Sequence, residues 1–243
     1  TAGAQRNHDP DADPFAPLDK LYRMEAVRQK LQQLRDTVEL AVRDGEEKPD
    51  LGHFVFSGAP GTGKTTVARV MADILFKLDL IGRNNVIETS GLELTGEFVG
   101  ATKKRVQDQL DKAKGGVLFI DEAYELAKGQ YGQEAVTTLV AAMTDPQYAG
   151  MTIIIAGYQA DIFTMLDANV GLKSRFKHFL EFPDWTPQDC FDLFHKLALS
   201  KAFDLDLEGV GKILLPGFKR LLPLKGWGNA RDVHKFWEEV MQN

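Results

Sequence analysis

One short segment has the residue types and spacing of a phosphate-binding loop. It reads Gly-Ala-Pro-Gly-Thr-Gly-Lys-Thr over residues 58–65 and matches the pattern G-x-x-x-x-G-K-[ST] in full. Glycines keep such a loop free of side-chain bulk, so its backbone N–H groups can surround phosphate oxygens. Lys64 supplies a charge for the β and γ phosphates, and the Thr65 hydroxyl suits Mg²⁺. The residues expected to contact a nucleotide here are Gly58, Ala59, Pro60, Gly61, Thr62, Gly63, Lys64, Thr65 and Thr66.

A second segment places two carboxylates at the end of an apolar strand. The apolar run at 116–120 leads directly into Asp121 and Glu122. Ligands in open parallel sheets sit at the carboxyl ends of the strands. Asp121 is therefore a candidate Mg²⁺ ligand together with Thr65. Glu122 is the candidate base that would polarise the water attacking the γ phosphate, which indicates ATP hydrolysis rather than binding alone.

Strand and helix signals alternate through the middle of the chain. Short apolar runs predict strands at 53–57, 85–88, 116–120, 151–156 and 179–182, and periodic segments predict helices at 65–80, 99–114, 133–143 and 161–166. Strands that alternate with helices indicate a parallel sheet covered on both faces, and so an α/β fold. After Pro183 the strand signals stop, and the remaining residues predict three helices, at 187–201, 207–222 and 229–241.

The predicted organisation has three parts: a flexible leader over 1–17, an α/β nucleotide-binding domain over 18–183 and a helical lid subdomain over 184–243. The leader contains three prolines, three aspartates and one large apolar residue, Phe15, which is too little to form a core. From Leu18 onward, apolar residues at three- and four-residue steps predict a long helix that ends near Gly45.

Composition excludes several classes of protein. With 243 residues, 44% of them hydrophobic and 26% charged, the chain suits one or two globular domains. A net charge of −6 argues against a dedicated nucleic-acid binder. The single cysteine, Cys190, excludes an internal disulfide and is expected in the core. No apolar run reaches the ~18 residues needed to span a bilayer.

These observations predict a soluble intracellular protein with no membrane partner. The cytoplasm is the expected compartment, and an organelle or the nucleus remains open. The chain begins at Thr1 rather than Met, which suggests a fragment or a processed product.

Taken together, the motifs resemble those of AAA+ ATPases. Within that superfamily the sequence resembles the red-type Rubisco activase (CbbX/CfxQ-like) family, which also includes stage V sporulation protein K-like proteins. Besides the phosphate loop, the resemblance rests on residues 115–124, on Ala-Gly-Tyr at 156–158 and on Asn-Ala-Arg at 229–231. It implies a P-loop NTPase (AAA+) parallel-sheet sandwich with a C-terminal all-helical lid. It also implies ATP and Mg²⁺ as cofactors, and a hexameric ring with nucleotides between subunits.

The resemblance assigns roles to three further residues. Arg175 falls at the arginine-finger position, where a cation from one subunit meets the charge that develops on the γ phosphate in its neighbour. Arg231 falls at the sensor-2 position of the lid, where it would contact the nucleotide and act in catalysis. A surface role is the alternative for both arginines. Tyr158 is the candidate for sensor 1.

Phe98, Val99 and Gly100 resemble the pore loop that grips a polypeptide in the ring channel. The alternative is that Phe98 anchors this loop in its own core. The leading hypothesis is therefore an ATP-hydrolysing ring that remodels a protein client through a central pore. One alternative is a nucleotide-dependent scaffold or regulatory module within a larger protein. A nucleic-acid motor is less favoured. The chain has a net negative charge, and its sequence shows no group of aromatic and basic residues that would bind a nucleic acid.

Overall fold

The computed structural model describes residues 13–46, 50–96 and 100–242. These residues form two compact units. The first contains the described residues up to Ser57 together with Thr65–Glu181, and the second contains Gly58–Lys64 together with the described residues from Phe182 onward. The phosphate loop, expected within the α/β domain, therefore packs with the C-terminal helices.

A five-stranded sheet with the order β2-β3-β4-β1-β5 forms the centre of the first unit. The strands are β1 (His53–Gly58), β2 (Val86–Ser90), β3 (Val117–Asp121), β4 (Thr152–Gly157) and β5 (Phe176–Phe182). β2, β3, β4 and β1 pair in parallel, so their carboxyl ends share one edge. The predicted α/β fold is confirmed.

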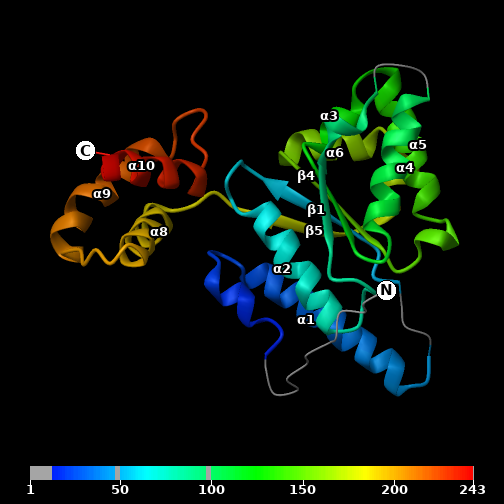
Figure 1. The fold of residues 1–243 in the computed structure, drawn as a ribbon, viewed down its shortest axis with the longest axis horizontal. Helices are drawn as coiled ribbons and strands as arrows, with labels where there is room; N and C mark the ends of the chain where they lie inside the picture. Colours follow the sequence, from blue (N-terminus) through cyan, green and yellow to red (C-terminus); the bar gives the residue numbers. More distant parts are fainter. Residues whose placement is uncertain (1–12, 47–49, 97–99, 243) are drawn as a thin grey trace. The chain divides into compact units, whose positions relative to one another are not determined.

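Helices cover both faces of this sheet (Figure 1). On one face α4 (Ala101–Ala113), α5 (Gly129–Ala142), α6 (Gln159–Asp167) and α7 (Val170–Lys173) contribute to a core with side chains of β1, β3 and β4. α1 (Glu25–Arg43) and α2 (Lys64–Lys77) lie on the other side of the sheet (Figure 1). All six residues of β4 are buried, as expected for a strand covered on both faces.

Several short elements between the predicted ones have no counterpart in the sequence analysis. They are α3 (Gly91–Leu94), α7 and the 3₁₀ helices η1 (Ala16–Lys20), η2 (Ala123–Ala127) and η3 (Pro146–Tyr148). α3 begins with a capping box, in which Ser90 and Glu93 each accept the other's backbone N–H. Elements of three to five residues are too short to show a helical period.

The end of the expected flexible leader differs from the prediction. Phe15 is only 1% exposed, and the guanidinium groups of Arg28 and Arg35 lie over its ring. Asp13 accepts from Arg28 at 3.2 Å. Residues from Asp13 onward are therefore part of the first unit, while residues 1–12 lie outside the described part of the chain. The expected helix starts later than Leu18, at Glu25.

The second unit contains three C-terminal helices, as predicted: α8 (Pro187–Ser200), α9 (Leu207–Leu221) and α10 (Ala230–Gln242). Thr186 and Asp189 form a capping box at the start of α8. Cys190 is fully buried among these helices, and burial raises the pKa of its thiol to about 12. The expectation that Cys190 belongs to the core is confirmed.

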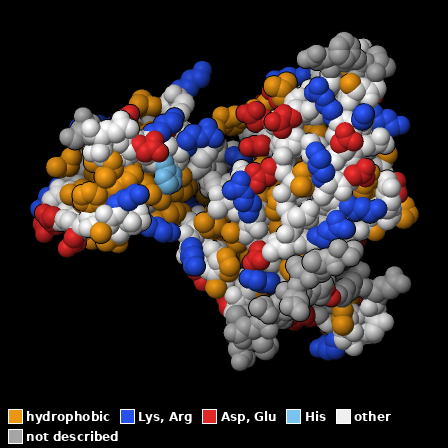
Figure 2. All heavy atoms as spheres, viewed as in Figure 1, with side chains coloured by type: hydrophobic (Ala, Val, Ile, Leu, Met, Phe, Trp, Pro, Cys, Tyr) orange, Lys and Arg blue, Asp and Glu red, His pale blue; other side chains and the backbone are white. Residues whose placement is uncertain are grey.

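The surface carries mixed charge and some apolar exposure. Figure 2 shows Lys and Arg side chains interspersed with Asp and Glu over the visible face of the first unit. The C-terminal helices and the segments that join them expose large apolar side chains, namely Leu199, Phe203, Leu207, Ile213, Leu221, Leu224, Val240 and Met241. Within the described residues, no helix has the length and apolar character needed to cross a bilayer.

Candidate nucleotide-binding site

The phosphate loop directly follows β1 and leads into α2. Gly61 and Gly63 have φ values of +70° and +104°, a backbone region that L-residues with a Cβ atom rarely adopt. The Thr62 hydroxyl donates to the carbonyl oxygen of Ala59 at 2.8 Å, which closes the loop on itself. α2 begins at Lys64, so the positive end of its helix dipole lies directly after the loop.

Lys64 is held by the backbone of the same loop. Its amine donates to the carbonyl oxygens of Gly58 and Ala59, each at 2.8 Å, and the residue is buried. Ala230 at the start of α10 donates its backbone N–H to the Gly61 carbonyl at 3.2 Å. A Cβ atom at Gly61 would lie 1.9 Å from the Gly228 carbonyl oxygen, so the loop and residues 228–230 approach closely.

Thr65 and Asp121 provide the oxygen ligands expected for Mg²⁺. Thr65 lies in the first turn of α2, and Asp121 ends β3. Within the described residues, no group of three His, Cys, Asp or Glu side chains could hold a metal ion. Mg²⁺ in phosphate-transfer sites takes one or two protein oxygens and completes its shell with waters and phosphates. The donor set therefore fits Mg²⁺ that binds together with a nucleotide.

Glu122 has an unusual backbone conformation at the tip of β3. Its φ of +47° lies in the left-handed region, which is uncommon for a residue other than glycine. Its N–H donates to the Asp121 carboxylate at 2.9 Å, and its carbonyl accepts from Glu125 at 3.0 Å. These bonds hold the exposed side chain at the carboxyl edge of the sheet. Strained residues of this kind occur often at functional sites.

Tyr124 and Tyr158 lie near the same edge. Their rings are 6.3 Å apart, and Tyr158 precedes α6 at the end of β4. Burial and the nearby carboxylates of Glu122 and Glu125 raise the pKa of Tyr124, so its phenol stays protonated at neutral pH. Tyr158, the candidate for sensor 1, is largely exposed.

Arg175 is half-buried just before β5. One guanidinium nitrogen donates to the Gly171 carbonyl at 2.7 Å, while the buried Nε atom has no hydrogen-bond partner among the residues that the structure describes. Arg231 is exposed in the first turn of α10. Its side chain forms no ion pair among the described residues.

The candidate pore loop falls mainly outside the described residues, since Phe98 and Val99 belong to the range 97–99. Gly96 and the loop residue Gly100 border this range and are described. The Gly96 N–H donates to the Thr102 hydroxyl at 2.8 Å, and Gly100 precedes α4 with φ of +82°. The described residues thus fix both ends of this loop.

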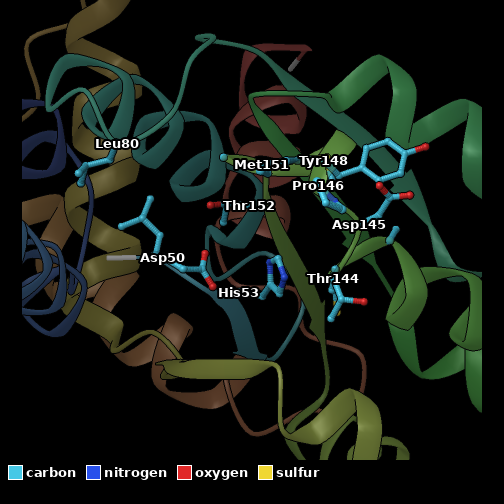
Figure 3. A pocket seen from close by; sticks show the side chains of 14 residues that line it. Asp50, His53, Leu80, Thr144, Asp145, Pro146, Tyr148, Met151 and Thr152 are labelled. Atoms are coloured by element: carbon cyan, nitrogen blue, oxygen red, sulfur yellow. The ribbon is translucent and has the colours of Figure 1, made fainter. Parts of the chain in front are cut away.

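A separate pocket lies at the opposite, amino-terminal ends of β1 and β4 (Figure 3). It has a volume of about 390 Å³, and its lining includes Asp50, His53, Asp145 and Thr152. His53 is 8% exposed and accepts the Ile153 N–H at 3.1 Å. Burial lowers the pKa of His53 to about 4, so the ring is neutral. Nothing in the sequence indicated this pocket.

The structure also adds functional candidates that the sequence did not indicate. Gly91 packs against the Glu122 carbonyl, where an added Cβ would lie at 2.6 Å. Asn229 belongs to a motif noted in the sequence, but its contact with the phosphate loop spans 169 positions. A pairing over that distance leaves no local pattern.

Comparison with known proteins shows the family to which the chain belongs. Residues 54–184 match the family described as "ATPase family associated with various cellular activities (AAA)". Stage V sporulation protein K of Bacillus subtilis is 32% identical over 93% of this chain and 72% of its own length. The CfxQ homolog of Galdieria sulphuraria is 35% identical over 82% of this chain and 66% of its own. EccA3 of the Mycobacterium tuberculosis ESX-3 secretion system is 43% identical over 60% of this chain, but only 24% of its own length.

Solved structures support the fold. A mutant of RuvB from Thermotoga maritima has a TM-score of 0.62 at 23% identity, over 93% of this chain and 64% of its own. The FIGL-1 AAA domain, solved with ADP, has a TM-score of 0.60 at 20% identity, over 89% and 70%.

Fold and loop together define a P-loop NTPase. The chain belongs to the AAA ATPase family, and its relatives place it with the CbbX/CfxQ/SpoVK-like members, as the sequence resemblance predicted.

Proposed function

We propose that the protein binds ATP with Mg²⁺, hydrolyses it, and uses the cycle in a ring of copies to remodel a protein client. The observation that carries this proposal is the pair Asp121 and Glu122 at the carboxyl edge of the sheet where the phosphate loop also begins. A base at this edge distinguishes hydrolysis from binding.

Each residue has a defined task in the proposed reaction. The backbone N–H groups of the loop and the Lys64 amine bind the phosphates, and Thr65 and Asp121 hold Mg²⁺, which offsets phosphate charge. Glu122 accepts a proton from water as that water attacks the γ phosphorus. ADP and phosphate are the products. Arg231 contacts the same nucleotide from the C-terminal helices, and Tyr158 acts as sensor 1.

Ring assembly is supported by two features. The apolar side chains on the C-terminal helices suit burial against another copy, and Ile213 is the most exposed of them at 74%. Arg175 is only half-buried, and one hydrogen bond to the Gly171 carbonyl holds its guanidinium, so its exposed part suits contact with a group from outside the chain. In the proposed ring Arg175 reaches the nucleotide of the next subunit.

A protein client suits the surface better than a nucleic acid. Acidic and basic side chains alternate over the visible face of the first unit, rather than forming a basic stripe (Figure 2). Phe98, Val99 and Gly100 are the proposed contact with the client.

A second candidate function, a nucleotide-dependent module of a larger protein, is favoured by the short match within EccA3.

Glu122→Gln tests the proposed hydrolysis. We expect ADP binding to stay within about twofold of the parent while phosphate release falls on the order of 100-fold or more. Glu181→Gln, at an exposed position of β5, is the matched control and should keep parental turnover. Parental turnover in Glu122→Gln would refute its role as the base. Mass measurement with and without ATP separates the ring from the isolated module.

A further inference from the structure

Asn229 joins three segments of the second compact unit. Its side-chain Nδ2 donates to the Pro60 carbonyl at 3.1 Å and to Asp184 Oδ1 at 3.2 Å. Its Oδ1 accepts the backbone N–H of Trp185 at 3.0 Å. The residue is 1% exposed. One buried amide therefore connects the phosphate loop, the segment that leads into α8 and the start of α10.

The partners determine how this amide is oriented. Turned over, its oxygen would face two acceptors, the Pro60 carbonyl and the Asp184 carboxylate, and its NH₂ group would face the Trp185 N–H. In the observed orientation both amide hydrogens and the oxygen are used. Aspartate has similar size but, when ionised, offers no donor to Pro60. The contact with the loop therefore depends on an amide.

The backbone around Asn229 strengthens the same connection. Asn229 has φ of +46°, a left-handed conformation that non-glycine residues adopt rarely. The following residue, Ala230, donates to the Gly61 carbonyl. The carbonyls of Pro60 and Gly61 thus accept hydrogen bonds from Asn229 and Ala230, respectively. The N–H groups of the loop are the atoms that bind phosphate, and the carbonyl bonds determine the direction in which those groups point.

We propose that Asn229 is a positioning residue for the nucleotide. It acts through Pro60: its amide holds the phosphate loop in a shape suited to phosphates and links that shape to the position of α10. The inference rests on the nucleotide binding proposed above. Coupling of this kind is reciprocal. If nucleotide binding favours the loop conformation in which Pro60 accepts from Asn229, then loss of that hydrogen bond must weaken nucleotide affinity.

Asn229→Asp breaks the bond to Pro60 but also places two carboxylates side by side, at residues 229 and 184. The double variant Asn229→Asp/Asp184→Asn repairs the second effect alone. Its new amide at 184 can donate to the carboxylate at 229, the Trp185 N–H keeps an acceptor, and the pair carries the same single charge as in the parent. Among the three hydrogen bonds of Asn229 described above, only the donor to Pro60 is missing.

Binding of ADP that carries a fluorescent group on its ribose, together with thermal unfolding, measures the two effects separately. We expect the single variant to lose both stability and ADP affinity. The double variant should recover most of the thermal stability but keep an ADP affinity on the order of tenfold below the parent, as for loss of a buried hydrogen bond. Asn229→Gly, which retains the left-handed backbone without the amide, should show the same loss of affinity.

A purely structural role predicts the opposite pattern, in which ADP affinity returns together with stability. Parental ADP affinity in the double variant would overturn the inference and leave the proposed function intact. Absence of ADP binding by the parent would overturn the proposed function and this inference with it. Lys64→Ala defines the signal of a protein that cannot bind the phosphates.

Discussion

The side-chain amine of Lys64 lies 2.8 Å from the carbonyl oxygen of Gly58, the residue at which the phosphate loop begins. The Ala59 carbonyl accepts from the same amine. Two carbonyls of the loop therefore hold the lysine amine against the loop itself. Phosphate oxygens carry more negative charge than carbonyls and form stronger bonds to an ammonium group. A nucleotide can thus draw this lysine from contacts within its own loop.

Lys64→Ala should strongly weaken nucleotide binding for two reasons. The variant lacks the ammonium charge that would bind the phosphates. The carbonyls of Gly58 and Ala59 also lose the hydrogen-bond donor that they share. We expect ADP affinity to fall on the order of 100-fold, as for loss of charge-assisted hydrogen bonds. Lys77→Ala, at the far end of α2 and paired with Asp73, is the control and should bind ADP as the parent does. Near-parental affinity of Lys64→Ala would contradict the role of the loop.

Gly91→Ala should slow turnover without weakening ADP binding. The added methyl group would lie 2.6 Å from the Glu122 carbonyl, so residues 122–125 must shift. Displacement of a catalytic group by about 1 Å can cost on the order of 100-fold in rate. Gly82→Ala is the matched control, because the nearest atom to its Cβ is 3.7 Å away. Steady-state phosphate release measures the effect, and an unchanged kcat would show that Glu122 does not need this position.

Mixing two inactive variants tests whether Arg175 serves a neighbouring subunit. Arg175→Ala and Lys64→Ala should each be inactive alone. In a random equal mixture, half of the sites keep Lys64 and half of those face an intact Arg175, so about a quarter of parental activity should return in a head-to-tail ring. No recovery in rings confirmed by mass measurement to contain both variants would place Arg175 outside the shared site.

His53 should make the protein less stable in mild acid. Burial lowers its pKa in the folded protein to about 4, from the ordinary histidine value of 6.5. The stabilisation that depends on neutral His53 is complete above pH 6.5 and is lost as the pH falls toward 4. His53 of the unfolded chain binds a proton at a higher pH than His53 of the folded protein, so acid favours unfolding. Between neutral pH and pH 5 this group should contribute a loss of ~2 kcal/mol in the free energy of unfolding.

Urea unfolding of the parent and of His53→Gln at the two pH values checks this contribution. Glutamine can still accept the Ile153 N–H but does not titrate in this range. The loss of stability on acidification should therefore be ~2 kcal/mol smaller in His53→Gln. An equal loss in both proteins would show that His53 is not the group responsible.

The longer elements were predictable because burial leaves a pattern along the chain. β1 and β4 are continuous apolar runs, and the sheet covers them on both faces, so both were found within one or two residues. The predicted start of the first long helix, at Leu18, lies before the observed start of α1 at Glu25. The apolar residues before Glu25 are in a segment where Arg23 has φ of +60°, which a helical period does not reveal.

The chemistry of the site was predictable, but its supports were not. The types and spacing of Lys64, Asp121 and Glu122 follow a motif that chemistry requires. Gly91 and Asn229 act through contacts made only in the folded chain: a van der Waals approach to one carbonyl and a hydrogen bond to another. Such contacts depend on packing between distant segments and leave no trace in spacing.

Within the described part of the chain, the strand order β2-β3-β4-β1-β5 leaves β2 and β5 with one unpaired edge each, and unpaired edges promote aggregation. Both strands carry charged side chains: Glu88 of β2 pairs with Arg69, and β5 exposes Lys177 and Glu181. Charges on an edge strand discourage the addition of a strand from another molecule. Replacing these residues with valine or threonine should therefore favour fibrous aggregates at high protein concentration, even if the fold itself is retained.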